Sequence, residues 1–389
     1  MPLNLKFCRL TAFAFILLCL PAAAFAATPQ SGIGAPMRIV YGFDREFAPF
    51  SYEDPGGKPV GFDIDIIEAI FQGKATLAMR PLNWFSIQPE LGAGTIHLTS
   101  GMVRTPQRAR AFAFSTLPTF DLKLRFFTKV YKRVPNATFL RGQAVAVEEG
   151  SAQLTLLQQF GGINVKQFKS RTLALRALYN EEVDAFCGPD EPSYYIIRKL
   201  NYGAITTVGT PLASTELRIA IHRDRGDILR IVNDGLAELV KSGEYDRIYR
   251  RWFIVDLTKP EKDALIKAAL GATISAYAPY GKMNMGAAVL TATGKVFSGC
   301  NIENADPNLS VSAVRSAIAA AILANEQEIK AVVQVNQDGT VVMPAPQDYQ
   351  SLYEFGRGIQ VLSPNGEAPM VTQLFPSPVS RNIFALEMK

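Results

Sequence analysis

The chain contains little cysteine and histidine, with four Cys and two His among 389 residues. Cys8 and Cys19 lie in an N-terminal leader considered next, which leaves Cys187 and Cys300 in separate regions. Two such thiols do not make a disulfide framework, even in an oxidising compartment. From residue 265 onward there is no His and only one Cys, so a zinc site of thiolates and imidazoles cannot be assembled there. We therefore expect no metal and no other cofactor.

Charge of one sign and long apolar runs are also scarce. The formal net charge is +5, and Lys6 and Arg9 contribute two of these charges, so no nucleic-acid-binding surface is indicated. The apolar stretch at residues 10–20 is shorter than the roughly 20 residues that span a bilayer. With Ala24-Phe25-Ala26 after it, it predicts an export signal over residues 1–26. We expect a soluble periplasmic protein; an uncleaved membrane anchor is the alternative.

Length and pattern together predict several folded domains. Apolar residues make up 48% and charged residues 19% of the chain, as in globular proteins. Residues 37–256 alternate short strand-like runs with helical stretches, which is typical of α/β layers. A polar, proline-containing stretch at residues 257–264 is the best candidate linker. Residues 265–389 are numerous enough for a core of their own.

Seven short motifs follow one another in the first region: Phe47-Ala48-Pro49-Phe50-Ser51, Val60-Gly61-Phe62-Asp63-Ile64-Asp65, Asn83-Trp84, Ser100-Gly101-Met102, Thr105-Pro106-Gln107-Arg108, Glu182-Val183-Asp184-Ala185 and Ser242-Gly243-Glu244-Tyr245-Asp246. In their order and separations they resemble the extracellular solute-binding proteins of polar amino-acid transporters. The resemblance implies a type II periplasmic-binding-protein fold, in which two α/β lobes close on a ligand. Lobe one would comprise residues 37–128 and 215–256 and lobe two residues 129–214, with two strands crossing as the hinge.

The chemistry of an amino-acid ligand agrees with this resemblance. Its carboxylate needs a cation, its ammonium an anion or carbonyls, and its stem an apolar wall. Arg108 suits the first role, because a guanidinium matches a carboxylate with two hydrogen bonds, and the family uses the Arg of T-x-x-R in this way. The alternative is a surface Arg in a basic stretch. Phe47 and Phe50 would form the wall, although Phe50 suits the core equally well.

The resemblance also places Asp44, Ser100 and Gly101 at the ligand. The backbone amides of Gly150 and Ser151, just before a helix, would hold an anion, because free N–H groups and the helix dipole favour negative charge. A simple N-cap role for Ser151 is the alternative reading of the same position.

Two departures from the family concern the ligand itself. Val103 replaces a hydroxyl residue common in relatives, which removes one hydrogen bond from the pocket. Relatives also place an acid for the ligand ammonium five residues after the Asp of V-D-A, where this chain has Pro189, with Asp190 one residue later. Either a one-residue bulge returns Asp190 to the pocket, which we favour, or the ammonium site is lost.

The last region contains motifs of a different kind: Ala276-Tyr277-Ala278-Pro279-Tyr280-Gly281-Lys282, Gly299-Cys300-Asn301-Ile302-Glu303-Asn304, Arg315-Ser316-Ala317-Ile318 and Glu354-Phe355-Gly356. These resemble the cytidine deaminases and imply a C-terminal α/β/α domain. Deaminases need zinc on three protein ligands and a Glu that moves protons. Here Ser312-Ala313-Val314 stands where the family has C-A-E, and Pro344-Ala345-Pro346-Gln347-Asp348 where it has P-C-x-x-C. We therefore expect a catalytically degenerate domain and no enzyme.

Two side chains of the family's sugar-binding strand persist, namely Asn301 and Glu303. Either they belong to a retained nucleoside site, or they support a strand end and a turn. We favour the second interpretation, because Met283 replaces the Phe that relatives stack near the base.

These patterns predict a periplasmic solute-binding protein that presents an amino-acid-like or carboxylate ligand to an ABC-type permease or to a sensor. One alternative is a ligand-sensing signalling protein whose C-terminal domain docks a partner or binds a nucleoside. Others are an enzyme on the two-lobed scaffold, with Glu149 and Asp190 as acid/base candidates, and a working deaminase. Fold analogy adds a homo-oligomer through the C-terminal domain, where the Ala-rich helix at residues 313–324 could pack against a neighbour.

Overall fold

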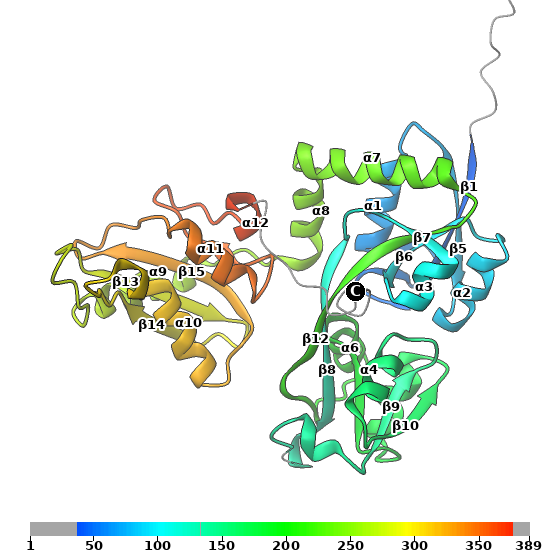
Figure 1. The fold of residues 1–389 in the computed structure, drawn as a ribbon, viewed down its shortest axis with the longest axis horizontal. Helices are drawn as coiled ribbons and strands as arrows, with labels where there is room; N and C mark the ends of the chain where they lie inside the picture. Colours follow the sequence, from blue (N-terminus) through cyan, green and yellow to red (C-terminus); the bar gives the residue numbers. More distant parts are fainter. Residues whose placement is uncertain (1–36, 133, 376–389) are drawn as a thin grey trace, which may run out of the picture. The chain divides into compact units, whose positions relative to one another are not determined.

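The computed structural model describes residues 37–132 and 134–375 (Figure 1). The expected export signal and the last residues of the expected C-terminal domain lie outside the described residues. Within the described ranges, no helix combines the length and apolar character needed to cross a membrane.

Lobe one is built on three parallel strands. β1 (Arg38–Asp44) pairs with both β5 (Thr76–Leu82) and β6 (Leu98–Val103). Its helices are α1 (Phe62–Phe71), α2 (Trp84–Gly92), α3 (Pro106–Ala111), α7 (Gly226–Ser242) and α8 (Glu244–Phe253). Shorter strands are β2 (Glu46–Phe47), β3 (Ser51–Glu53), β4 (Pro59–Val60) and β7 (Phe112–Phe114). Buried isoleucines of α1 pack with Ile39 and Tyr41 in one apolar core.

Lobe two repeats the plan. Its parallel strands are β9 (Ala144–Glu148), β10 (Asn164–Phe168) and β11 (Ala185–Pro189), and its helices are α4 (Gln153–Phe160), α5 (Arg171–Tyr179) and α6 (Asp190–Lys199). Short 3-10 helices lie at Val130–Lys132 and Ala137–Leu140. Neighbouring residues of one strand enter different cores, Phe186 with α5 and α6, and Cys187 with Leu157 of α4. This alternation shows that both faces of the sheet are covered.

Two long antiparallel strands join the lobes into one sheet. β8 (Phe120–Lys129) and β12 (Ile205–His222) pair with each other over most of their length. β8 also pairs with β11 of lobe two, and β12 with β6 and β7 of lobe one. The strand order is β10-β9-β11-β8-β12-β6-β1-β5, and in Figure 1 the two strands run from one lobe into the other.

The C-terminal region is a three-layer α/β/α unit. Its sheet has the order β14 (Val296–Cys300), β13 (Met285–Thr291), β15 (Ile329–Asn336) and β16 (Gln360–Val361). Ala288 and Leu290 of β13 face α9 (Lys259–Thr273), whereas Ala287 and Val289 face α10 (Ala313–Leu323) and α11 (Pro346–Tyr353). A 3-10 helix at Pro307–Leu309 and α12 (Val371–Leu374) complete the unit.

The stretch expected to be a linker is instead the start of a helix. The Thr258 side chain accepts a hydrogen bond from the Glu261 amide, and the Glu261 carboxylate accepts one from the Thr258 amide. Together they form a capping box at the start of α9. Pro260 lies in the first turn, where a missing N–H costs nothing. The polar, proline-containing composition was therefore that of a helix N-terminus.

Candidate ligand-binding site

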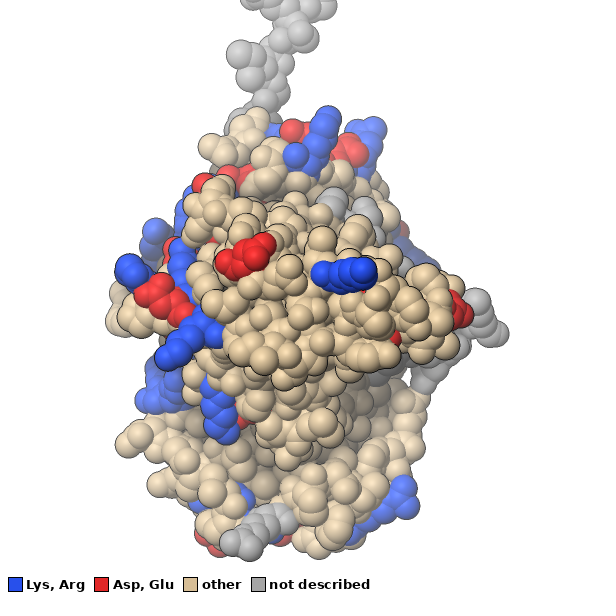
Figure 2. All heavy atoms as spheres, turned by 90° about the vertical axis from the view of Figure 1, so that its left-hand side faces the viewer, with Lys and Arg blue, Asp and Glu red and all other residues tan. Residues whose placement is uncertain are grey.

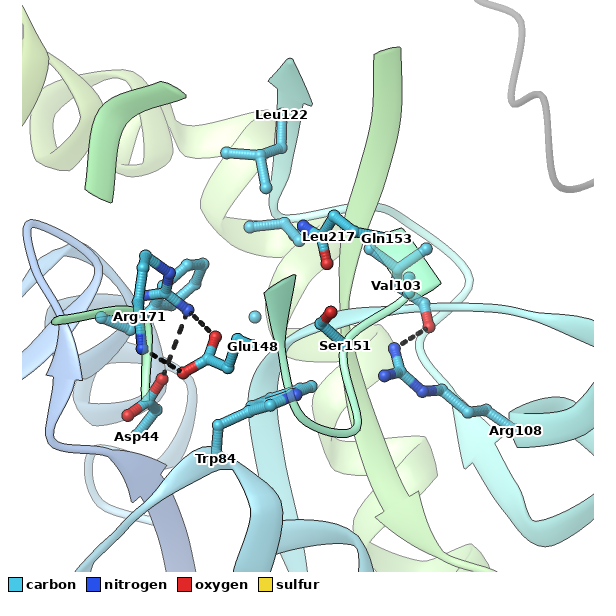
Figure 3. A pocket seen from close by; sticks show the side chains of 13 residues that line it. Asp44, Trp84, Val103, Arg108, Leu122, Glu148, Ser151, Gln153, Arg171 and Leu217 are labelled. Atoms are coloured by element: carbon cyan, nitrogen blue, oxygen red, sulfur yellow. Dashed lines mark hydrogen bonds and ion pairs between the residues drawn. The ribbon is translucent and has the colours of Figure 1, made fainter. Parts of the chain in front are cut away.

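A pocket lies between the two lobes, at the carboxyl ends of their parallel strands. Asp44, Val103 and Glu148 are the last residues of β1, β6 and β9. Open α/β sheets bind ligands at such strand ends. The space between the lining atoms, open solvent included, amounts to about 380 Å³. The lining residues, most of them labelled in Figure 3, are Asp44, Phe47, Trp84, Gly101, Val103, Arg108, Leu122, Glu148, Ser151, Ala152, Gln153, Arg171 and Leu217.

Aromatic rings form part of the wall. Phe47 and Trp84 both line the pocket and are 6% and 8% exposed. Phe50 stacks behind Phe47 at a centroid distance of 4.8 Å but is fully buried and does not line the pocket. Of the two phenylalanines expected at the ligand, Phe47 therefore faces the pocket and Phe50 belongs to the core.

Gly101 and Ser100 face different ways. Gly101 lines the pocket with φ +69°, and a Cβ there would lie 2.8 Å from the Phe47 ring, so a glycine is needed for both conformation and space. Ser100 does not line the pocket; its Oγ donates to Asp63 Oδ2 at 2.9 Å and is hydrogen-bonded to the Tyr41 hydroxyl. Burial raises the pKa of Asp63 to about 7. Ser100 thus does not face the pocket, and its side chain bonds to buried residues behind the pocket wall.

Arg108 is buried at the pocket with only neutral partners for its guanidinium. Nη1 donates to the Val103 carbonyl at 2.9 Å, Nη2 to the Gly150 carbonyl at 2.7 Å, and Nε to Gln88 Oε1 at 3.3 Å. Its side chain lies 5.4 Å from the centre of the Trp84 ring. Burial lowers the pKa of Arg108 to about 10. The alternative of a surface arginine is excluded, since the residue is 6% exposed.

The Gly150-Ser151 turn of lobe two reaches the same place. The Gly150 carbonyl also accepts hydrogen bonds from Trp84 Nε1 and Gln88 Nε2, at 3.3 and 3.1 Å, so it ties the lobes together. The residue before α4 is Ala152, and no side chain caps this helix. Ser151 is therefore no N-cap: its Oγ is buried without a hydrogen-bond partner and lines the pocket.

A cluster of three ionisable side chains occupies the opposite side of the pocket (Figure 3). Arg171, the first residue of α5, pairs with Glu148 at 2.5 Å and lies 3.8 Å from Asp44 Oδ2. Burial, together with the neighbouring Glu148 charge, raises the pKa of Asp44 to about 7, while Arg171 opposes that shift. Burial also raises the pKa of Glu148. Sequence reasoning missed Arg171 and Glu148 because both lie outside the seven motifs; Glu148 directly precedes Glu149-Gly150-Ser151.

Asp190 is not brought to this pocket. It is the first residue of α6, and its Oδ2 accepts from Arg125 Nε at 2.8 Å in a buried ion pair. β11 pairs with β8 in unbroken register through Pro189, so the expected bulge is absent from this strand. Glu149, the other acid considered for catalysis, pairs with Lys169 at 2.7 Å and is 40% exposed. Neither acid stands free at the pocket.

In the C-terminal region, Ser312, Ala345 and Asp348 align with the zinc ligands of the deaminases, but their side chains are not the thiolates that the family has there. Ser312 caps α10 and its Oγ donates to Asp348 Oδ1 at 2.5 Å, while Arg315 Nε lies 3.4 Å from the same oxygen. Ala345 directly precedes α11 and makes no side-chain capping hydrogen bond, and Val314 is fully buried. A hydroxyl, a methyl group and a carboxylate already paired with a guanidinium do not suit Zn²⁺. No group of three His, Cys, Asp or Glu in residues 37–132 and 134–375 is placed to hold a metal.

Asn301 and Glu303 bind the backbone of their own domain. Asn301 Oδ1 accepts from the Met285 amide at 2.8 Å, and its Nδ2 donates to the Met283 carbonyl at 3.0 Å. Glu303 accepts from the amides of Tyr280 and Gly281. Through these contacts both side chains support a strand end and a turn.

Two α/β lobes on a shared sheet, with a pocket at the strand ends between them, define a type II periplasmic binding protein. Residues 39–255 match the family of bacterial extracellular solute-binding proteins, family 3, and the chain belongs to that family. Residues 247–345 match the cytidine and deoxycytidylate deaminase zinc-binding region. Homologues of this chain are amino-acid-binding periplasmic proteins.

Three similar proteins illustrate the range of the family. The L-cystine-binding protein TcyJ of Escherichia coli (strain K12) is 23% identical over 225 residues, which are 57% of this chain and 84% of that protein. An ancestral arginine-binding protein bound to glutamine has a TM-score of 0.52 at 28% identity and covers 56% of this chain and 97% of its own. A histidine kinase sensor domain with similarity to periplasmic binding proteins has a TM-score of 0.54 at 25% identity, covering 56% and 96%.

Proposed function

We propose that this chain is an exported periplasmic protein that captures a small amino-acid-like or carboxylate ligand between its lobes for an ABC-type permease. The observation that carries the proposal is the buried Arg108, whose guanidinium meets only neutral oxygens. Burying a charge without a counter-ion is costly, so an anionic ligand would repay that cost. Ser151 Oγ, which also lines the pocket, is a free hydrogen-bonding group for the same ligand.

The proposal is tested by thermal shift assays with L-amino acids and small carboxylates. A ligand at 100 times its dissociation constant should add about 2.7 kcal/mol to the free energy of unfolding. We expect the shift to disappear in Arg108→Ala and to persist in Arg110→Ala, an exposed residue of the same helix. An equal shift in Arg108→Ala and the wild type would overturn the assignment of Arg108.

We further propose that the C-terminal domain does not deaminate. The contacts of Ser312, Asp348 and Arg315 support this, because the side chains at the zinc positions satisfy one another. Val314, at the place of the family's Glu, cannot carry a proton. Incubation of the full chain with cytidine and zinc, followed by ultraviolet absorbance, tests the proposal. Sustained uridine formation that is abolished in Asp348→Ala would contradict it.

A signalling role is the second candidate, and hydrogen bonds between the C-terminal domain and the hinge strand favour it. Arg357 and Tyr353 both donate to Asp121 of β8, at 2.5 and 3.0 Å. Lys123, two residues along the same strand, donates to the Phe355 carbonyl at 2.8 Å. A change in β8 on ligand binding would therefore reach α11, as signalling requires. The similarity to a kinase sensor domain points the same way.

The surface of the C-terminal domain offers such a partner a weakly charged face. Charged side chains are sparse over the centre of the face in Figure 2. Large apolar side chains exposed on this domain include Ile274 and Leu323, at 87% and 86%, and Tyr280 and Leu309, at 62% and 65%. Exposed apolar side chains mark an interaction surface where they form one contiguous patch. Ala317 and Ala321 of α10 are buried in the domain's own core, whereas Ala319 of the same helix is exposed.

A further inference from the structure

The part of the pocket that contains Arg171 has the chemistry of a subsite for a cation. It presents an aromatic face, Phe47, and two buried carboxylates, Asp44 and Glu148. An aromatic face attracts a cation through its quadrupole, and carboxylates bind a guanidinium through charge-assisted hydrogen bonds. A ligand with a guanidinium or ammonium side chain would find all its partners there.

Arg171 already makes the contacts that such a ligand would make. Its guanidinium carbon lies 4.9 Å from the centre of the Phe47 ring. Nη2 pairs with Glu148 at 2.5 Å and approaches Asp44 Oδ2 to 3.8 Å, while Nη1 donates to the Glu46 carbonyl at 3.1 Å. The side chain is 4% exposed. It therefore fills this subsite and leaves no room for a second cation on the same ring face.

The location of Arg171 is not explained by helix capping. It is the first residue of α5, where the helix dipole disfavours a positive charge. The capping hydrogen bond is made by Ser170, whose Oγ accepts from the Leu173 amide. Arg171 belongs to lobe two, whereas Glu46 and Phe47 belong to lobe one, so its contacts also span the cleft.

We infer that Arg171 is a built-in occupant of the cationic subsite, which excludes ligands with cationic side chains and holds the lobes together without a ligand. The inference deepens the proposed function and rests on it for the ligand class. The ligand of this chain is then an acid with a neutral or acidic side chain, bound at Arg108 and Ser151 on the other side of the pocket (Figure 3).

Isothermal titration calorimetry on Arg171→Ala tests the exclusion of cations. We expect L-arginine and L-lysine to bind the variant at least tenfold more tightly than the wild type. Arg171→Gln serves as a second variant that retains bulk, and Arg176→Ala, exposed on the same helix, should behave as the wild type. Equal affinity for L-arginine in the wild type and both Arg171 variants would overturn the inference.

The distance between the lobes provides a test that is independent of any ligand. Spin labels at Gln72→Cys and Arg198→Cys, both exposed, report this distance once Cys300 is replaced by Ser; Cys187 is buried. In the ligand-free protein we expect one short distance, and a longer or broader distribution after Arg171→Gln. The same open distribution with and without Arg171 would overturn the inference. If instead no amino acid or carboxylate binds any variant while the distances change as expected, the proposed function fails and the closure by Arg171 stands.

Discussion

The first region has the fold of a ligand-binding family, and the C-terminal region has the fold of a catalytic family. The two regions differ in whether the buried polar groups at the family's site position have partners within the chain. In the cleft, Arg108 is buried against carbonyl and amide oxygens and Ser151 Oγ has no partner. In the C-terminal domain, Asp348 is buried against Ser312 and Arg315. A buried polar group without a matching partner is costly, so it indicates that something outside the chain supplies one. A fully matched group indicates a structural role.

The largest expected effect comes from restoring the zinc ligands. The triple variant Ser312→Cys, Ala345→Cys, Asp348→Cys should gain zinc affinity by more than about a thousandfold, because it supplies the three thiolates that suit Zn²⁺. Ser312 already contacts Asp348, and the Asp348 amide donates to the Ala345 carbonyl. Competition against a chromogenic chelator measures it. Cytidine turnover should remain absent, since Val314 still cannot move a proton. A variant that binds no more zinc than the wild type would show that these helix ends are not arranged as a metal site.

A smaller effect is expected from Asp348→Ala alone. Removing this carboxylate leaves the Ser312 hydroxyl without its acceptor, which should lower the free energy of unfolding by about 1–3 kcal/mol. Urea denaturation measures the change. Ligand binding in the cleft should be unaffected, because Asp348 lies in the other domain. Loss of amino-acid binding in Asp348→Ala would instead show that the C-terminal domain affects the ligand site in the cleft.

A third effect concerns the pH dependence of the first region. The pKa of Asp63 is about 7 in the folded chain, against an ordinary value of 3.8, so the folded state holds a proton that the unfolded state has lost. The free energy of unfolding should therefore fall as pH rises from about 4 to 7, by at most about 1.4 kcal/mol per pH unit for this group. Asp44, with its pKa raised to about 7, adds in the same direction. In Asp63→Asn the slope should be shallower; an unchanged slope in urea titrations at pH 5, 6 and 7 would be the contrary result.

The sequence could predict the parts of the site that depend on short local motifs. Phe47, Gly101, Arg108 and Ser151 line the pocket as expected, because each belongs to a short motif or turn whose position follows from the fold. Asp190 does not line the pocket, although we expected it there. A shift of one residue changes the side of the strand-to-helix turn on which a side chain lies, and on its side Asp190 pairs with Arg125.

Other features could not be predicted because they depend on contacts distant in sequence. Arg171 reaches Glu46 and Phe47 across the cleft, more than 120 positions away. No periodicity encodes such a contact. The linker was predicted wrongly because a proline in a polar stretch fits a helix start as well as a loop, and only the capping hydrogen bonds of Thr258 distinguish them.

The hinge has one further property with a mechanical meaning. Between Val208 and Ala213, five residue steps on β12 face only two on β8, and Gly209 within this surplus has φ 56°. β8 has no corresponding surplus, so the extra residues of the hinge belong to β12 alone. A change of angle between the lobes can then alter the backbone dihedrals of residues 209–212 while the hydrogen bonds on either side stay in register. We therefore expect the angle between the lobes to change by bending at the hinge, with the backbone of β12 changing its conformation at residues 209–212.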